Sequence, residues 1–564
     1  MIKKIQILRS KFKKYNIDGY IIPKNDDYFT EYSKINRLKI ISNFTGSAGL
    51  AVILKKKNYL FTDGRYTIQS QIESGKNFQI ISFEKLINCN LFKNLKLGID
   101  PKLFTYHQIK KFFLKNNEIK FIDKNLIDEI QKQKINDSFP FFSLKKNIVG
   151  ESINSKLNKI SKYLKKKKSD YIFISAPENV AWILNIRGGD GPNSPIPNSR
   201  LIISKTKKIF LISKIKKCKK LFREKIIKSN EFIDTEEFPK KILNLKGKSF
   251  IIDSGSCSIF YEDIIKSKFK IIKGGDPAYL LKAIKNKTEI NNMKKAHILD
   301  GAALTKFIYW IKNINKQQIT EVDAQNKLEK FRSMSKSFLY PSFDTIAGSG
   351  KNGAIVHYRA KKENCRIIKN KDIFLCDSGG QYKYGTTDVT RTICFSKPNQ
   401  NIKNIFTKVL KGHIAVATTN LNKDNIGKKI DKRARKFLKQ NNLDYAHGTG
   451  HGVGFFLNVH EGPQSISKIN KVKIKEGMIL SNEPGYYKKN KFGIRIENLV
   501  YVKKANKKVF FENLTLAPIE KDLINFKLLS SSEKNYLFKY HLNVYSSISK
   551  YLNLKEKKWL TTFI

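Results

Sequence analysis

Residues 373–394 read IFLCDSGGQYKYGTTDVTRTIC. Asp377 lies in the first apolar run of this stretch, and Asp388 directly precedes the second. Both runs are rich in the residue types that strands favour, and the segment between them is rich in turn formers. The pattern predicts a β-hairpin that brings the two carboxylates to one place.

A second stretch repeats this design further along the chain. Glu483 ends the strand-like run GMILSNE, a turn-rich loop follows, and Glu497 lies within GIRIENLVYV. Between the two stretches, HGTGHGVG supplies His447 and His451, and His460 follows in NVHEGP. One domain is therefore expected to contain two acid-bearing hairpins and a histidine cluster.

Four convergent carboxylates need nearby positive charge, because like charges raise one another's pKa. A lone buried acid is more often a capping or salt-bridge residue, but four in repeated hairpins beside histidines favour two divalent cations. Oxygen and imidazole donors suit Mn²⁺ first, with Zn²⁺, Co²⁺ or Fe²⁺ as alternatives, and the absence of thiolates argues against a structural zinc site. The glycines of HGTGHGVG are expected to let the backbone come close to the metals and the substrate.

The part of the chain that precedes this domain contains a weak internal repeat. DYIFI at 170–174 resembles DGYII at 18–22, and RLIISKTKKIFLI at 200–212 resembles LAVILKKKNYLF at 50–61. Asn185 also falls where Asn43 fell in the first copy. The repeat predicts two related α/β domains, because solenoid repeats are far shorter. An amphipathic helix is expected at the N-terminus, ahead of the first strand.

The domain boundaries are expected at residues 131–150, which are polar and rich in lysine, and at 273–277, which read KGGDP. Residues 288–313 then place apolar side chains at helical intervals. Thr288 is the expected N-cap of this long helix, with Glu289 in its first turn.

Composition limits the class of protein. The 564 residues carry a formal net charge of +61, but the charge is mostly lysine, is spread along the whole chain and accompanies an excess of Ile, Asn, Phe and Tyr. We interpret it as a solvated surface and expect no nucleic-acid partner. No apolar window is long enough to span a bilayer. The six cysteines lack paired spacing, which predicts reduced thiols in the cytoplasm; they are Cys89, Cys218, Cys257, Cys365, Cys376 and Cys394.

Motifs along nearly the whole chain resemble the pita-bread metallopeptidases, and within them the three-domain, cytosolic Xaa-Pro aminopeptidases. The motifs are FTGSAG, TDGRY, NVAWILNIRG, VHY, LCDSGGQY, TTDVTRT, HGTGHGVG, NVHEGP, NEPGYY, GIRIEN and the tail LTLAPIEKDLI. The resemblance implies an α/β (α+β) fold with two creatinase-N-like α/β domains at 1–140 and 141–282. A pita-bread catalytic domain at 283–510 and a C-terminal tail at 511–564 would follow them.

The resemblance also implies roles for individual residues. The metal ligands would be Asp377, Asp388, His451, Glu483 and Glu497. Glu483 is also expected to carry the proton of the attacking water, since a carboxylate beside the nucleophile has the right reach. His357, His447 and His460 are expected to act in catalysis and substrate binding.

Arg65 matches an arginine that reaches the substrate, although on the residues alone it could simply pair with Asp63. The other histidines are interpreted as structural: His107, His297, His413 and His541.

The implied activity is removal of the N-terminal residue from peptides whose second residue is proline. Prolidase-type dipeptidase, methionine aminopeptidase and creatinase activities are the alternatives within the fold. A non-catalytic binding protein on the same fold is the alternative of another class. The resemblance also allows a homodimer. The two upstream domains and the tail favour the aminopeptidase among these alternatives.

Overall fold

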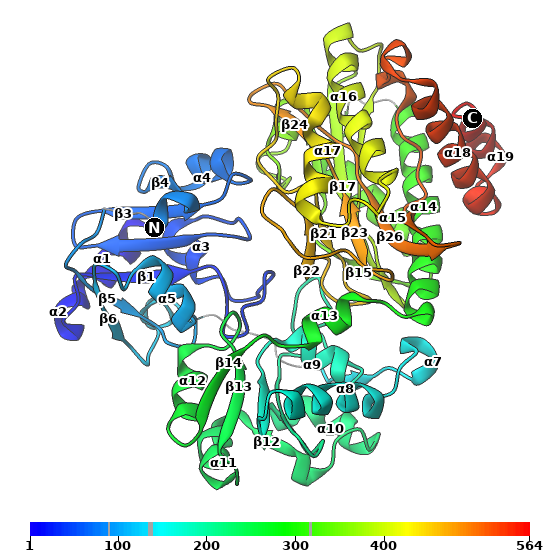
Figure 1. The fold of residues 1–564 in the computed structure, drawn as a ribbon. Coiled ribbons are helices and arrows are strands. Elements are labelled where there is room, and N and C mark those ends of the chain that lie inside the picture. The colour runs from blue at the N-terminus through cyan, green and yellow to red at the C-terminus, as the bar shows by residue number, and fades with distance from the viewer. Residues whose placement is uncertain (88–90, 133–138, 315–317) are drawn as a thin grey trace. The chain divides into compact units, whose positions relative to one another are not determined.

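The computed structural model describes residues 1–87, 91–132, 139–314 and 318–564. Cys89 and residues 133–138 of the expected boundary at 131–150 lie outside the described residues. The chain divides into two compact units, residues 1–279 and 280–564 (Figure 1). Each unit has its own sheets and its own buried apolar clusters.

The first unit contains two six-stranded sheets of the same topology. The first sheet has the order β4 (Gln79–Ser82), β3 (Asn58–Thr62), β2 (Leu50–Leu54), β1 (Gly19–Pro23), β5 (Lys96–Ile99), β6 (Glu118–Phe121). The second has the order β12 (Phe232–Asp234), β11 (Ile209–Ser213), β10 (Arg200–Ser204), β8 (Tyr171–Ile174), β13 (Ser249–Asp253), β14 (Lys270–Gly274). In both, the central strand pairs antiparallel with one neighbour and parallel with the other. The predicted duplication is confirmed.

The repeated asparagines have the same backbone role in the two copies. Asn43 directly follows helix α3 (Arg37–Ser42) with φ 64°, and Asn185 lies two residues after the end of α9 (Pro177–Ile183) with φ 51°. At the end of a helix, the left-handed backbone conformation is adopted most often by glycine and next by asparagine. The weak sequence repeat therefore marks equivalent turns.

Short helices connect the strands of this unit. The remaining ones are α1 (Ile2–Ser10), α2 (Phe12–Tyr15), α4 (Thr67–Ser74), α5 (Tyr106–Phe112), α6 (Leu126–Ile130), α7 (Lys146–Val149), α8 (Ile153–Lys166), α10 (Ile215–Arg223), α11 (Phe238–Asn244) and α12 (Ile259–Lys266). A two-stranded ladder joins β7 (Phe142–Ser143) to β9 (Ile186–Arg187). The expected amphipathic helix at the N-terminus is confirmed, since α1 buries Ile5 and Leu8. Helix α13 (Ala278–Ala283) lies at the division between the units.

The second unit begins with the predicted long helix, α14 (Lys287–Asn313). Its expected cap was wrong by two residues, because Asn286 and not Thr288 is the N-cap. The Asn286 side chain accepts from the backbone N–H groups of Thr288 and Glu289 at 3.0 and 3.1 Å. The Glu289 carboxylate accepts from the Asn286 N–H at 3.0 Å. This capping box satisfies donors at the helix start that a cap at Thr288 would leave open.

The strands of the second unit form two antiparallel arrangements of the same design. The first comprises β15 (Phe338–Pro341), β16 (Ile346–Ser349), β17 (Ile373–Ser378), β18 (Gly380–Tyr382), β19 (Gly385–Thr386) and β20 (Val389–Cys394). The second comprises β21 (Gly450–Gly452), β22 (Glu461–Ile466), β23 (Ile479–Asn482), β24 (Gly485–Lys488), β25 (Phe492–Arg495), β26 (Asn498–Ala505) and β27 (Lys508–Asn513). β17 pairs with β20 and β23 with β26, as the acid-bearing stretches predicted. Each connecting loop adds a small hairpin, β18–β19 or β24–β25.

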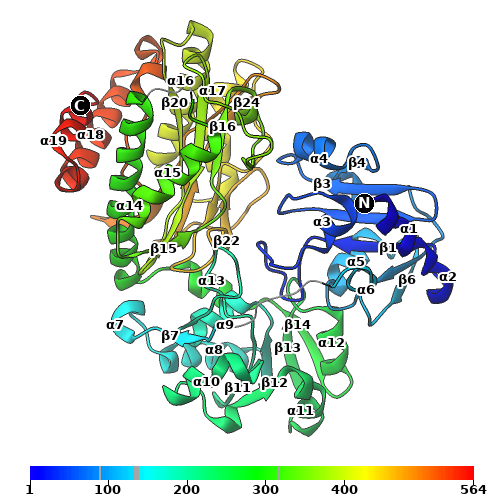
Figure 2. The same cartoon turned by 180° about the vertical axis from the view of Figure 1, so that it is seen from behind.

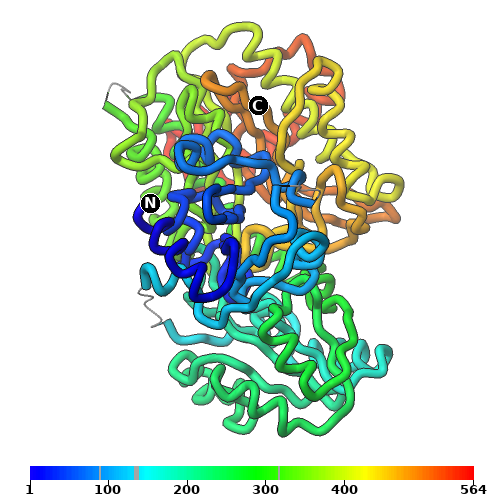
Figure 3. Tube along the Cα trace, turned by 90° about the vertical axis from the view of Figure 1, so that its left-hand side faces the viewer, coloured from blue at the N-terminus to red at the C-terminus, as the bar shows by residue number. Residues whose placement is uncertain are grey.

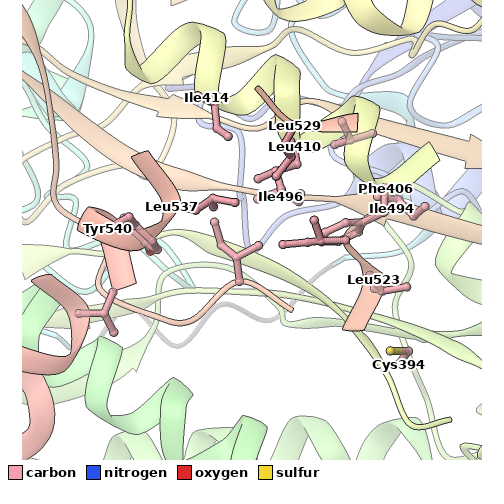
Figure 4. Close-up of a cluster of buried hydrophobic side chains, with 14 of the residues drawn as sticks. Cys394, Phe406, Leu410, Ile414, Ile494, Ile496, Leu523, Leu529, Leu537 and Tyr540 are labelled. Atoms are coloured by element: carbon pink, nitrogen blue, oxygen red, sulfur yellow. The ribbon is translucent and has the colours of Figure 1, made fainter. Parts of the chain in front are cut away.

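Helices and the tail cover these strands. They are α15 (Glu321–Ser333), α16 (Gln400–Ala417), α17 (Gly427–Lys439), α18 (Ser531–Ile548) and α19 (Leu554–Thr561). Phe406 and Leu410 of α16 pack with Ile494 of β25 and with Leu523 and Leu537 of the tail (Figure 4). Helices α18 and α19 contact α14 (Figure 2), and Figure 3 traces the whole path to the red C-terminus. Among the described helices, none combines the length and apolar character of a membrane span.

Arg391 of β20 joins the tail to the strands. Its buried guanidinium donates to the carbonyl oxygens of Glu497 at 2.7 Å and Ala517 at 2.9 Å, and to the Tyr540 hydroxyl at 2.9 Å. We expect Arg391→Met to lower the free energy of unfolding by roughly 3–5 kcal/mol, because it leaves several buried acceptors unpaired. Urea denaturation measures this change. Arg433→Met, at an exposed arginine of α17, is the control, and an equal loss in both variants would contradict this role.

Candidate active site

The four acids lie where antiparallel strands end. Asp377 is the penultimate residue of β17, and Asp388 directly precedes β20. Glu483 directly follows β23, and Glu497 directly precedes β26. Because the paired strands run antiparallel, the end of one meets the start of the other. Each strand pair therefore brings two carboxylates to one edge.

Hydrogen bonds join these two edges into one site. The Thr390 hydroxyl donates to Glu497 Oε2 at 2.8 Å, and the Glu497 N–H donates to the Thr390 carbonyl at 3.2 Å. The Thr392 hydroxyl donates to the Arg495 carbonyl at 2.9 Å and accepts from the Arg495 N–H at 3.0 Å. The predicted convergence of the acids follows from this pairing of β20 with the segment before β26.

His451 lies among the carboxylates. Its Nε2 is 3.4 Å from Asp388 Oδ2 and 3.6 Å from Glu483 Oε1. One donor atom each of Asp388, His451 and Glu497 lie within 4.8 Å of one another. Gly450 makes this approach feasible, since a Cβ there would overlap the carbonyl oxygen of Ser481 on β23. The close approach that glycine permits here is therefore between two strands.

Burial of the site shifts the pKa values of its carboxylates and of His451. Burial raises the pKa of Asp388 to about 6, and the charges of Asp377 and Glu483 act in the same direction. Burial also raises the pKa of Glu497 well above its usual range. Burial lowers the pKa of His451, but the hydrogen bond to Asp388 and the charge of Glu483 outweigh it and raise this pKa to about 9.

The donor set fits divalent cations. Among the described side chains, two buried carboxylate oxygens of this cluster, Asp377 Oδ1 and Glu497 Oε1, have no hydrogen-bond partner. A buried carboxylate oxygen without a partner is costly. A metal ion satisfies such oxygens, and mixed carboxylate and imidazole donors are those that Mn²⁺, Fe²⁺, Co²⁺ and Zn²⁺ accept.

Two further residues extend the site and were missed by the sequence analysis. Arg495 Nη2 lies 2.6 Å from Asp377 Oδ2, and its Nη1 donates to the Tyr487 hydroxyl at 2.5 Å. The Tyr487 hydroxyl is also 2.8 Å from His447 Nε2. A polar chain thus connects Asp377 to His447. Its sequence signal was an arginine inside the apolar strand of GIRIEN, a position that calls for a buried anionic partner.

The three predicted histidines occupy different positions. His447 Nδ1 is 4.0 Å from Glu483 Oε2, and the His460 ring meets the His451 ring edge-on, with centroids 4.3 Å apart. Both lie with the acids, as expected. His357 lies in the turn after η5 (Gly350–Ala354), next to Val356, whose carbonyl is 3.5 Å from Arg495 Nη2. Its segment therefore borders the cluster.

Arg65 lies in the other compact unit. Its Nη2 is 2.7 Å from Asp63 Oδ2 and its Nε 3.0 Å from Asp63 Oδ1. The guanidinium also lies over the Tyr66 ring at 5.3 Å. The pairing with Asp63 that the residues alone suggested is thus present. The contact of Arg65 with substrate stays a prediction.

Models of known families match four consecutive segments of the chain. Residues 291–504 match metallopeptidase family M24, and residues 508–562 match the C-terminal region of that peptidase family. Residues 4–130 and 131–289 each match a creatinase/prolidase N-terminal domain. The expected fold, with two creatinase-like domains before a pita-bread domain, is confirmed.

Individual proteins match over nearly the full length. The chain is 35% identical over 594 residues to a probable Xaa-Pro aminopeptidase P of Laccaria bicolor, covering 98% of this chain and 91% of that protein. It is 36% identical over 601 residues to Xaa-Pro aminopeptidase 1 of Dictyostelium discoideum, covering 99% and 95%.

Solved structures agree with these sequence matches. The crystal structure of X-prolyl aminopeptidase from Caenorhabditis elegans, described as a cytosolic enzyme with a di-nuclear active site, superposes with a TM-score of 0.92. It is 29% identical, over 100% of this chain and 99% of that one. The prolidase of Pyrococcus horikoshii gives a TM-score of 0.52 at 27% identity, over 65% of this chain and 99% of that one.

Proposed function

Because the chain belongs to metallopeptidase family M24, we propose that it is an Xaa-Pro aminopeptidase. It hydrolyses the bond between an N-terminal residue and a penultimate proline. The observation that carries this proposal is a cluster of four carboxylates and one imidazole, with unpaired buried oxygens, in a chain that matches Xaa-Pro aminopeptidases over nearly its full length. The relatives and the solved structure that match this chain over nearly its full length are named as Xaa-Pro aminopeptidases, which favours that activity over the dipeptidase.

The enzyme uses two divalent metal ions. We assign their binding to Asp377, Asp388, His451, Glu483 and Glu497, and we favour Mn²⁺ because oxygen donors predominate. When bound, the ions supply Lewis acidity that polarises the scissile carbonyl and makes a water molecule more acidic.

Glu483 has the position of a proton carrier. The side chain of Glu483 is 18% exposed and that of Asp388 is 5% exposed, so Glu483 is more accessible to solvent. It lies between His447 and His451, at 4.0 and 3.6 Å. We propose that it accepts the proton of the attacking water and passes it to the departing proline nitrogen.

The remaining residues act on the substrate. We propose that His357 and His460 donate hydrogen bonds to the oxyanion or to the departing proline, as donors already in place. His447 is held by Tyr487 beside Glu483 and orients the proton carrier. Arg65 is proposed to bind the substrate, and Asp63 holds its guanidinium.

The domain bounds, the location and the assembly of the chain are also proposals. We propose domains at 1–140, 141–282 and 283–510 with a tail at 511–564, a cytoplasmic location like that stated for the C. elegans enzyme, and a homodimer. Light scattering on the purified protein tests the dimer, which has twice the mass of the 65.2 kDa chain.

Removal and return of metal tests the proposed chemistry. We expect dialysis against a chelator to abolish release of arginine from Arg-Pro-Pro, and Mn²⁺ to restore it more fully than Zn²⁺, Co²⁺ or Fe²⁺ at equal occupancy. Metal content is measured by atomic emission on the same samples. Full activity in protein shown to be free of metal would contradict the proposal. If another ion restored more activity than Mn²⁺, only the choice of metal would be wrong, and the proposed activity would stand.

A further inference from the structure

The segment that carries His357 has little regular structure of its own. Between the end of β16 at Ser349 and the start of β17 at Ile373, the only helix is η5. A single isolated bridge, Thr320 to Ile367, ties it to the residue before α15. Irregular backbone beside a site keeps one conformation only if its polar groups find fixed partners.

One buried carboxylate supplies those partners. Glu321, in the first turn of α15, has no exposed surface. It accepts from the backbone N–H of Ser349 at 2.7 Å, the backbone N–H of Arg366 at 2.9 Å, the Asn352 amide at 3.0 Å and the Tyr358 hydroxyl at 2.8 Å. The Asn352 amide also donates to the Tyr358 hydroxyl at 2.9 Å. Widely spaced points of the segment thus meet on a single side chain.

His357 lies between two anchored neighbours. On one side, the Val356 carbonyl is 3.5 Å from Arg495 Nη2, which is 2.6 Å from Asp377. On the other side, Tyr358 is held by Glu321. The first contact ties the segment to the metal-ligand cluster, and the second ties it to α15. Together they fix the backbone on both sides of one imidazole.

If packing were the only role of this side chain, a buried carboxylate would cost free energy that an apolar residue of the same size would not. Burial raises the pKa of Glu321, which shows that the interior resists its charge. The hydrogen bonds that Glu321 accepts act in the opposite direction on this pKa, and because they are directional they fix the orientation of the segment more tightly than apolar contact does.

We propose that Glu321 and Tyr358 are positioning residues that hold His357 against the metal-ligand cluster. The proposal rests on the function proposed above, in which His357 donates to the oxyanion or to the departing proline. Neither residue touches substrate. Their effect is on turnover, because a misplaced donor weakens stabilisation of the transition state more than binding of the ground state.

Tyr358→Phe is the mildest test, since it removes only the hydroxyl. We expect kcat on Arg-Pro-Pro to fall about tenfold, with little change in KM and full metal content. Glu321→Gln is expected to reduce kcat further, because its NH2 group would face either the Ser349 N–H, which now donates to Oε1, or the Arg366 N–H, which now donates to Oε2. Thermal melting checks that both variants are folded at the assay temperature.

A double-mutant cycle separates positioning from general stability. If Tyr358 acts through His357, then Tyr358→Phe has no further effect on kcat in the His357→Ala background. Additive losses would overturn the proposal. Tyr501→Phe is the matched control, since its hydroxyl also donates to a glutamate, Glu512, at 2.6 Å. We expect this control to keep the native kcat.

The cycle also distinguishes the two proposals. If His357→Ala is slow but Tyr358→Phe keeps the native kcat, the positioning role is wrong and the proposed function stands. If His357→Ala itself keeps the native kcat, the role given to His357 is wrong, and so is the positioning role of Glu321 and Tyr358. If neither the native chain nor any variant cleaves Arg-Pro-Pro, the proposed substrate is wrong.

Discussion

The Asp377→Asn variant is expected to cleave Arg-Pro-Pro far more slowly than the native chain and to lose bound metal while it stays folded. The exchange replaces one carboxylate oxygen by an amide nitrogen of nearly the same size, so packing in β17 is preserved. It removes a negative charge, and its NH2 group takes the place either of the unpaired oxygen Oδ1 or of Oδ2, the partner of Arg495. Loss of an outer partner costs roughly 10- to 100-fold in activity or metal affinity, and a direct ligand is expected to cost more.

Three measurements on one preparation decide this prediction. They are kcat on Arg-Pro-Pro, metal content by atomic emission, and the thermal midpoint. Asp424→Asn is the control, because Asp424 belongs to the same unit but pairs with the surface residues Lys429 and Arg433 at 3.6 Å. Native rate and metal content in Asp377→Asn would show that Asp377 is no ligand. If Asp377→Asn does not fold, the same measurements on Glu497→Gln test the ligand assignment, because Glu497 Oε1 is the other unpaired oxygen of the cluster.

Replacing proline by alanine at the second position of the peptide is expected to reduce kcat/KM about 100-fold or more. Proline has no N–H and its ring fixes φ near −65°, so a site shaped for it holds a bent tertiary amide. Alanine there adds an N–H without a built partner and leaves the space of the ring empty. Discrimination of this size is what shape and an unpaired polar group together supply.

The comparison uses Arg-Pro-Pro and Arg-Ala-Pro, with released arginine measured by chromatography. Two further peptides distinguish the alternatives within the fold. Preference for the dipeptide Arg-Pro would indicate a prolidase, and preference for Met-Ala-Ser would indicate a methionine aminopeptidase. Equal cleavage of the two tripeptides would contradict the role of proline. No cleavage of any peptide, with metal bound, would favour a binding protein.

The acid positions could be predicted because their signal is local. Asp377 and Asp388 flank a turn-rich segment between two strand-like runs, and short-range periodicity is enough to predict a hairpin. The small added hairpin β18–β19 could not be predicted, because its pairing with β15 depends on a strand far upstream in the sequence. Likewise, a helix was predicted at 288–313, but its expected cap, Thr288, was wrong, and only the capping box of Asn286 with Glu289 identifies the true cap.

The supporting residues depend on contacts between distant segments. Glu321 at the start of a helix has ordinary sequence surroundings, and Arg495, although a charged residue in an apolar strand, gives no sign of which acid it meets. Their importance comes from Asp377, 2.6 Å away, and from the loop at 349–366. Partners of that kind follow from tertiary structure and leave no periodic pattern in a single sequence.

The proposed ligands come from segments as far apart as residues 377 and 497, and hydrogen bonds of Thr390 with Glu497 close the gap between them. During synthesis, the ribosome therefore releases the first pair of acids long before the second. No complete site for the ions exists until the chain has passed Glu497 and the two halves have paired. The ions therefore bind only near the end of synthesis or after it. A chain truncated between the two halves would bind the ions poorly and unfold readily.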